Sequence, residues 1–401
     1  MGDGVTNYFE NFLKKESMFI QRGILSSGYV PDEIHHRDEQ LQQIAHILAP
    51  SLKSDKPSNL FLYGKTGTGK TLVMKHMKER LEETARNNNV PLKILYLNCK
   101  LKKIADTEYR IVAELARHLG KTIPPTGLPT DEVYNFFYQA LDEQNVLTVI
   151  ILDEIDQLVK KVADEIIYNF TRINTELKKA RVSIVGISND LLFINNLDPR
   201  VKSSLSEEEL VFPPYNALQI QDILRKRANL AFREGSVEPG VIEKCAAFAA
   251  REHGDARRAL ELLRVAGELA ERNNEKSIQI AHLDAAEDKI ERDKIHDIVK
   301  TQPKQFQLVL YAIFSIAKDK REGIFTGEIY EKYAFLCKRI GLRPLTQRRV
   351  SDVLAEFDMF GIINAKVISK GRFGRTREIS LSLADSIEVK IAKLLEQELQ
   401  L

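Results

Sequence analysis

Residues 59–71 read NLFLYGKTGTGKT, a short apolar run followed at once by a glycine-rich loop. The apolar run is typical of a strand that is buried on both faces of a parallel sheet. The loop matches the phosphate-binding pattern G-x-x-x-x-G-K-T, and the stretch after it has a helical pattern, which is the context that this motif requires. This segment therefore predicts an α/β domain that binds the phosphates of a nucleotide.

The residues of this loop have distinct expected tasks. Glycine permits the tight backbone path that turns N–H groups toward phosphate oxygens, and the helix N-terminus adds a positive dipole. Lys70 is expected to reach the β and γ phosphates, and Thr71 to offer its hydroxyl to Mg²⁺. The alternative, a glycine-rich turn with a surface lysine, is disfavoured by both flanks. The predicted nucleotide contacts in the loop are Gly64, Lys65, Thr66, Gly67, Thr68, Gly69, Lys70 and Thr71.

An acidic cluster ends a second apolar run, VIILDEID at residues 149–156. Sheets of the α/β class bind ligands at the carboxyl ends of their strands. Asp153 is suited to hold the Mg²⁺ shell through water, and Glu154 to orient or deprotonate an attacking water. Asp156 is expected to be a helix N-cap rather than a ligand. Alone, this cluster fits a capped turn equally well, so its assignment depends on the upstream phosphate loop.

The same rhythm of apolar runs and amphipathic stretches extends from residue 59 to about residue 215. It predicts five parallel strands flanked by helices, formed by NLFLY, KILYLNC, VLTVIILD, RVSIVGIS and ELVF. The fourth run ends in Ser188, Asn189 and Asp190. If its strand lies between the phosphate-loop strand and the acidic strand, Asn189 would face the γ-phosphate and help to position water. The alternative is a polar turn.

Two further domains are expected after the α/β domain, which we place at residues 1–214. Beyond Pro213 and Pro214 only helical patterns follow, which predicts a small helical domain at residues 215–295. From residue 300 to 401, helical patterns precede INAKVIS and REISLSL, two alternating runs separated by KGRFGRT. Two strands joined by a glycine-containing turn after a helix predict a winged helix-turn-helix.

The expected winged helix carries basic residues in two places where such domains meet double-stranded DNA. Thr346 is suited to N-cap a recognition helix whose first turn holds Gln347, Arg348 and Arg349, and whose apolar side holds Val350, Leu354, Phe357 and Met359. From Lys366 to Arg377 the hairpin adds five basic residues and no acidic one, as a wing that follows the DNA backbone or minor groove would. A protein-binding winged helix, or a hairpin that is merely solvated, remains the alternative. The hairpin residues are Lys366, Lys370, Arg372, Arg375 and Arg377.

Composition excludes several classes of protein. A chain of 401 residues, 43% hydrophobic and 29% charged, fits a multidomain globular protein. No segment approaches the roughly 20 apolar residues of a membrane helix, and the first 15 residues do not resemble a secretory signal. We therefore expect a cytoplasmic, nucleoid-associated protein with no membrane partner. Cys99, Cys245 and Cys337 lack the spacing of a zinc site or disulfide framework and are expected to be buried thiols.

With the phosphate loop, LDEID, ISND and a helical lid in this order, the first 290 residues resemble an AAA+ ATPase. The resemblance implies that HGDARRAL, residues 253–260, is a second sensor motif that aims Arg257 at the γ-phosphate, with Arg258 as the fallback. Without it, such an arginine pair fits a solvated face. The resemblance also implies that Val30, in the segment GYVP, contacts adenine, whereas ordinary packing is the alternative reading of that residue.

Within the AAA+ class, the chain resembles the archaeal initiator family related to the origin recognition complex and its helicase-loading cofactor. The resemblance rests on YVPDEIHHRDEQ, YGKTGTGKT, LDEID, GISND, DPRVKSSL, FPPYNALQ and HGDARRAL, followed by a winged helix. It implies a slow, Mg²⁺-dependent ATPase that switches between ATP and ADP. The implied partners are double-stranded origin DNA, the replicative helicase and other initiator subunits. Tyr215, in FPPYNALQ, then joins the implied nucleotide contacts.

Two segments need the resemblance for their interpretation. The box DPRVKSSL often carries a second arginine where Ser204 stands, so only Arg200 is available there as an arginine finger on a neighbour's ATP. The family also inserts a DNA-contacting helical element before the acidic strand, which implies that Lys121 contacts phosphates. A plain helix–helix loop fits residues 121–127 equally well.

Two other classes share parts of this plan. Signalling or transcription-regulating ATPases also join a phosphate loop, a helical lid and a winged helix, but LDEID and HGDARRAL count against them. A clamp-loader subunit would end in a helical collar, which the basic wing disfavours. The near-neutral net charge of +2 does not by itself indicate a nucleic-acid partner, so the local basic clusters carry that prediction.

Overall fold

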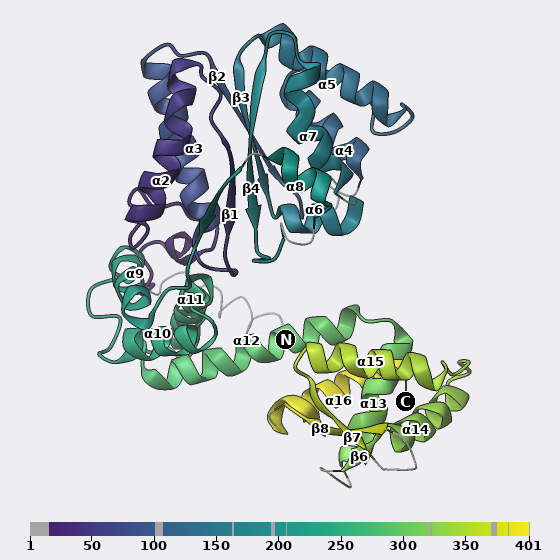
Figure 1. Ribbon diagram of the computed structural model, residues 1–401. Coiled ribbons are helices and arrows are strands. Elements are labelled where there is room, and N and C mark those ends of the chain that lie inside the picture. The colour runs from purple at the N-terminus through teal and green to yellow at the C-terminus, as the bar shows by residue number, and fades with distance from the viewer. Residues whose placement is uncertain are drawn as a thin grey trace, which may run out of the picture. The chain divides into compact units, whose positions relative to one another are not determined.

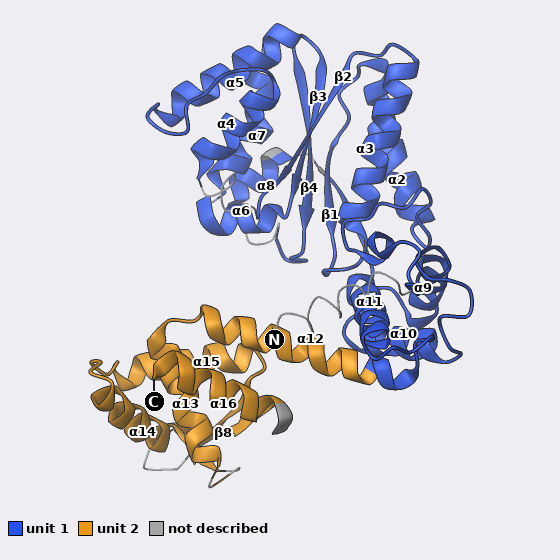
Figure 2. Ribbon diagram, turned by 180° about the vertical axis from the view of Figure 1, so that it is seen from behind, with its two compact units in different colours: residues 1–283 blue, residues 284–401 orange. Residues whose placement is uncertain are grey.

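The computed structural model describes residues 16–100, 107–162, 164–193, 197–205, 207–318, 320, 323–369, 375–383 and 385–400. The chain divides into two compact units, residues 1–283 and residues 284–401 (Figure 2). The first unit contains the α/β sheet and the lid helices. The second has its own core and sheet, so each unit is described by itself.

The sheet of the first unit has five strands in the order β2-β3-β4-β1-β5, and all neighbouring pairs are parallel. This confirms the predicted five-stranded parallel sheet. Its strands are β1 (Asn59–Tyr63), β2 (Leu92–Asn98), β3 (Leu147–Asp153), β4 (Arg181–Ser188) and β5 (Glu207–Val211). Because all five strands are parallel, the phosphate loop after β1, the acidic cluster after β3 and Asn189 after β4 lie at the same, carboxyl end of the sheet. These three segments are neighbours there because β4 lies between β1 and β3.

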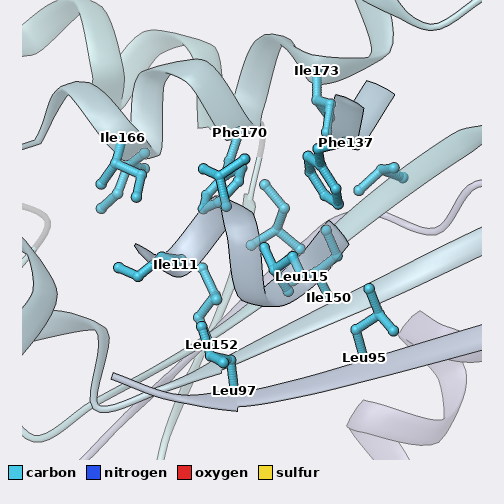
Figure 3. Packing of buried hydrophobic residues seen from close by; sticks show 14 of the residues in the cluster. Leu95, Leu97, Ile111, Leu115, Phe137, Ile150, Leu152, Ile166, Phe170 and Ile173 are labelled. Atoms are coloured by element: carbon cyan, nitrogen blue, oxygen red, sulfur yellow. The ribbon is translucent and has the colours of Figure 1, made fainter. Parts of the chain in front are cut away.

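Helices cover both faces of this sheet (Figure 1), as the fully buried strands β1 and β3 require. One face packs against α2 and α3, and the other against α4 to α8. Figure 3 shows the second layer, where Ile111, Phe137 and Phe170 meet Leu95 and Leu152 of the sheet. The helices are α2 (Asp38–Leu48), α3 (Lys70–Asn87), α4 (Glu108–His118), α5 (Thr130–Gln144), α6 (Ile155–Val162), α7 (Glu165–Glu176) and α8 (Pro199–Leu205).

The lid is built from α9 (Ala217–Ala231), α10 (Val241–Arg251) and α11 (Ala256–Arg272). Asn216 and Gln219 form a reciprocal capping box at the start of α9. The N-terminal segment packs on the lid through the 3₁₀ helix η1 (Arg22–Leu25) and through the Ile20 N–H, which donates to the Ala231 carbonyl at 2.8 Å. The limit expected near residue 295 lies inside α12 (Ile280–Thr301), which contains no glycine or proline that would end a helix.

The second unit is a winged helix. It contains α13 (Lys304–Ala317), α14 (Thr326–Arg339), α15 (Gln347–Met359) and α16 (Asp385–Leu399). Its three-stranded sheet has the order β6-β8-β7, formed by β6 (Ile324–Phe325), β7 (Ile363–Ser369) and β8 (Arg375–Leu381). The antiparallel pair of β7 and β8 confirms the predicted hairpin. The sequence did not predict β6, because two residues are too few to show an alternating pattern.

One core prediction in α15 is wrong. Val350, Leu354 and Phe357 are buried as expected, but Met359 is 74% exposed. Met359 lies two residues after Phe357, about 200° further around the helix, so it points away from the core-facing side. The burial prediction for the cysteines is confirmed, because Cys99, Cys245 and Cys337 are buried free thiols. In the described part of the chain, no helix is both long and apolar enough to cross a bilayer.

Candidate nucleotide and nucleic-acid sites

The phosphate loop connects β1 to α3, which begins at Lys70. Lys70 is only 4% exposed, and its ammonium donates to the carbonyls of Gly64 (2.6 Å) and Lys65 (2.8 Å). Because an ammonium has three donors, one donor remains for a phosphate oxygen. Burial, with the positive charge of Arg257 as a second cause, lowers the pKa of Lys70 to about 8.

Two glycines of the loop lie where a side chain has no room. A Cβ on Gly67 would come within 1.8 Å of Asp255 Oδ1, and a Cβ on Gly69 within 2.7 Å of the Tyr215 hydroxyl. Both glycines also have the positive φ that favours glycine (74° and 93°). The loop is therefore enclosed by Asp255 of the lid and by Tyr215, which lies just before the lid.

The predicted metal ligands lie side by side. Thr71 Oγ1 donates to the carboxylate of Asp153, 3.2 Å from each oxygen. Asp153 is 2% exposed, and it also accepts from the Tyr96 hydroxyl (2.6 Å) and Asn98 Nδ2 (3.5 Å). Burial, with the bond to Asp153, raises the pKa of Tyr96, so its hydroxyl remains a donor. One hydroxyl and one carboxylate beside a phosphate loop are the protein groups with which Mg²⁺ is usually bound.

Glu154 follows β3 with a positive φ of 57°, and its carboxylate lies 3.5 Å from Lys100 Nζ. Sequence reasoning missed Lys100, which lies two residues after the end of β2 and is part of no motif. The predicted capping role of Asp156 is wrong, because α6 already begins at Ile155. Asp156 instead accepts from the backbone N–H of Asn189 at 3.2 Å and so joins the ends of β3 and β4.

A pocket of about 580 Å³ lies next to the phosphate loop. Its lining includes Val30, Tyr215 and Arg257, three of the predicted nucleotide contacts, together with Tyr29 and Leu260. The N-terminal segment, α3 and the lid all contribute to this lining. The structure thus brings the residues proposed for the adenine and the γ-phosphate to one cavity that opens beside Gly69 and Thr71.

The two lid arginines have different surroundings. Arg257 lies in the first turn of α11, lines the pocket, and its charge acts on Lys70. Arg258 instead lies 3.2 Å from Glu252 in an ion pair. Asp255 caps α11 by accepting from the backbone N–H of both arginines. Of the two candidates for the second sensor, Arg257 is the one that faces the pocket.

Arg37 is a site residue that sequence reasoning did not single out. It is 2% exposed, and it donates to the carbonyls of Thr68 (3.0 Å) and Pro213 (2.6 Å). Its guanidinium also lies 3.8 Å from the centre of the Tyr215 ring. Arg37 therefore joins the phosphate loop to the segment that leads into the lid. It lies in the quoted segment HHRDEQ, but a charged residue there reads as exposed unless the fold is known.

In the second unit, α15 begins as predicted, with Thr346 accepting from the Arg349 N–H at 3.3 Å. Gln347, Arg348 and Arg349 are exposed in its first turn, although Arg349 lies 3.6 Å from Asp352. In the hairpin, Lys366 is exposed, whereas Arg377 is half-buried and donates to the Ser351 carbonyl at 3.0 Å. Lys370 and Arg372 lie outside the described residues, as does the side chain of Arg375.

The two remaining predicted contacts lie in the first unit and have partners of their own. Lys121, in the loop between α4 and α5, lies 2.7 Å from Glu143. Arg200, in α8, has an 85% exposed side chain that lies 3.1 Å from Asp198. Both ion pairs are at the surface, where such pairs stabilise little and exchange readily. They therefore leave both side chains able to bind another partner.

Three family models match the chain. They describe an AAA domain (residues 53–192), a Cdc6 AAA+ ATPase-type lid domain (residues 221–288) and a CDC6 C-terminal winged helix domain (residues 297–389). The ORC1-type DNA replication protein of Pyrococcus abyssi is 51% identical over 379 residues, which cover 94% of this chain and 90% of that protein. The chain belongs to the family of ORC1-type DNA replication proteins.

Other ORC1-type proteins agree. That of Archaeoglobus fulgidus is 48% identical over 395 residues, covering 98% of this chain and 95% of the relative. The solved structure of the Aeropyrum pernix ORC1 protein in complex with DNA is similar with a TM-score of 0.86 at 45% identity, covering 96% and 98% of the two chains. The crystal structure of Cdc6p from Pyrobaculum aerophilum is similar with a TM-score of 0.61 at 25% identity, covering 96% and 100%.

These likenesses confirm the AAA+ and initiator-family resemblance and remove the signalling-ATPase and clamp-loader alternatives. The AAA domain match, together with the phosphate loop, makes this ORC1-type protein a nucleotide-binding protein.

Proposed function

We propose that this protein is an ATP-dependent initiator of DNA replication that binds double-stranded origin DNA and helps to recruit the replicative helicase. The observation that carries the proposal is that one ORC1-type chain contains two different sites. One is a nucleotide pocket enclosed by a lid, and the other is a winged helix with an exposed basic recognition helix. A related ORC1 protein has been solved in complex with DNA.

For the nucleotide, we propose a slow switch rather than a motor. Lys70 and the loop amides hold the phosphates, and Thr71 and Asp153 hold Mg²⁺, which neutralises phosphate charge when bound. Glu154 and Asn189 orient the attacking water, and Arg257 contacts the γ-phosphate from the lid. The Glu154 carboxylate lies 3.5 Å from Lys100 Nζ, so Lys100 would lie close to the water that Glu154 orients.

For DNA, we propose that the first turn of α15 enters the major groove and that the β7–β8 hairpin follows the backbone. Arg348 and Lys366 are exposed and suited to this role. Lys121 and Arg200 are proposed as a further phosphate contact and as an arginine finger toward a neighbouring initiator subunit. A protein with this activity would act at the chromosome, and so with the nucleoid in the cytoplasm.

Footprinting of the full chain across its own genome, with ATP and with ADP, tests this function. Protected sites should cluster at replication origins. Arg348→Ala should weaken this protection at all salt concentrations. Lys393→Ala, an exposed lysine of α16, serves as the matched control. Protection that is spread evenly over the genome would reduce the proposal to unspecific DNA binding.

A further inference from the structure

Tyr96 makes a contact at the nucleotide site that no step above uses. Its hydroxyl donates to Asp153 Oδ2 at 2.6 Å, a shorter bond than those from Thr71 (3.2 Å) and Asn98 (3.5 Å). Tyr96 and Asn98 both donate to Oδ2, whereas Thr71 Oγ1 is the one donor shared equally by the two oxygens, at 3.2 Å from each. The two oxygens of the predicted metal-binding carboxylate therefore have different surroundings.

This contact follows from the register of the sheet. Tyr96 is paired with Ile151 and Asn98 with Asp153, so these side chains share the face of the sheet that α3 covers. The Tyr96 ring packs among the apolar residues of that face. Lys75, one turn after Thr71 in α3, lies with its Nζ 5.5 Å from the ring centre. The ring is thus held between sheet and helix, and its hydroxyl points at Asp153.

We propose that Tyr96 is a positioning residue for the metal-binding carboxylate: it holds Oδ2 of Asp153 so that Oδ1 is presented, beside Thr71, to the divalent cation. The inference rests on the proposed Mg²⁺ site. The terminal torsion of an aspartate is broad, and a carboxylate that is 2% exposed cannot be oriented by bulk water. Partners of this kind fix ligand orientation and typically change metal affinity by 10- to 100-fold.

A purely structural role for the hydroxyl makes a different prediction, and the chain offers a matched control. Tyr134 donates its hydroxyl to Glu108 Oε1 at 2.5 Å, in the same α/β domain but on the opposite face of the sheet. Tyr96→Phe and Tyr134→Phe each remove one hydroxyl that donates to a carboxylate, and each leaves the ring in place. Only the first touches a predicted metal ligand.

The test titrates Mn²⁺, followed by its paramagnetic resonance signal, into ADP-loaded full-length protein. Tyr96→Phe should raise the half-saturating Mn²⁺ concentration about tenfold, and Tyr134→Phe should leave it unchanged. ADP affinity in EDTA should stay within about twofold of wild type in both variants, because neither tyrosine is among the residues that line the nucleotide pocket. Melting temperatures show that each variant is folded at the temperature of the titration.

Thr71→Ala and Asp153→Asn separate this inference from the proposed metal site. If both shift the titration and Tyr96→Phe does not, the metal site stands and the role of Tyr96 is overturned. An equal loss of ADP affinity with and without metal in Tyr96→Phe would also overturn it, because it would show that the hydroxyl supports the loop and not the cation. If Thr71→Ala and Asp153→Asn leave the titration unchanged, the metal assignment and the inference both fail.

Discussion

At the scale of single residues, the phosphate loop contains two lysines, Lys65 and Lys70, that carry the same charge but differ in burial. Lys70 is buried with its ammonium held by two loop carbonyls, whereas Lys65 is exposed. Lys70→Ala should weaken ATP and ADP binding about 100-fold, because truncating one partner of a buried charged contact costs about 2 to 5 kcal/mol. Lys65→Ala should change affinity less than threefold. Calorimetric titration checks both, and equal losses would refute the assigned role of Lys70.

The adjacent lid arginines allow a second residue-scale prediction. Arg257 lines the pocket, whereas Arg258 is paired with Glu252. Arg257→Ala should reduce the preference for ATP over ADP, because the proposed partner of this side chain is the γ-phosphate alone. Arg258→Ala should leave that preference intact. Competition between the two nucleotides measures it, and a reversed result would assign the sensor to Arg258.

At the scale of elements, one carboxylate connects α5 to the start of β4. Asp142 accepts from the backbone N–H groups of Lys178, Lys179 and Ala180, at 2.9 to 3.2 Å. Burial alone would raise the pKa of Asp142, but these bonds outweigh it and hold the pKa below its ordinary value. The ionised form is therefore the one that stabilises the folded protein.

Asp142→Ala should lower the free energy of unfolding by about 1 to 2 kcal/mol at pH 7. A lowered folded-state pKa gives stability that is present above the unfolded-state pKa of about 3.9 and is lost as the pH falls through the folded value. The difference between variant and wild type should therefore shrink below about pH 4. Urea denaturation at several pH values measures it. Glu143→Ala, which removes a surface ion pair, is the control and should lower the free energy of unfolding by less than about 1 kcal/mol. If the difference in unfolding free energy between Asp142→Ala and wild type did not change with pH, this role of Asp142 would be contradicted.

The winged helix provides another prediction at this scale. Lys366 is exposed on β7, whereas Arg377 of β8 donates to the Ser351 carbonyl and so joins the hairpin to α15. Lys366→Ala should lower the salt slope of DNA affinity by about 0.9 without changing thermal stability. Arg377→Ala should lower the melting temperature of the winged helix, because it removes the hydrogen bond from Arg377 to the Ser351 carbonyl. If Arg377→Ala changes only the salt slope, Arg377 is a phosphate contact and not a connection between elements.

At the scale of the whole molecule, the two units should unfold separately. The nucleotide pocket is formed by residues of the first unit, and residues 284–401 have a core of their own. ATP at about 100 times its dissociation constant should stabilise the first unit by about 2.7 kcal/mol and raise its transition by about 5 °C. Double-stranded DNA should raise the other transition. Scanning calorimetry checks this, and one transition that both ligands move would show that the units unfold together.

Much of this protein could be predicted from residues that are neighbours in the chain. The phosphate loop, the acidic cluster after β3, the N-cap at Thr346 and the β7–β8 hairpin are local patterns, because a turn, a cap or a buried strand is specified by a few consecutive residues. The family resemblance rests on the order of such patterns. It therefore needed no knowledge of contacts between distant segments.

The tertiary structure alone decided which distant residues meet. Arg37 against Thr68 and Pro213, and Tyr96 on Asp153, leave no periodic signal, because a contact across the sheet or from the N-terminal segment depends on register and burial. It also decided that Arg257 and not Arg258 faces the pocket, and that Arg377 binds within its own unit. The sequence alone does not show whether a charged side chain is exposed to solvent or bonded within the fold. Only the packing of the folded chain distinguishes these two cases.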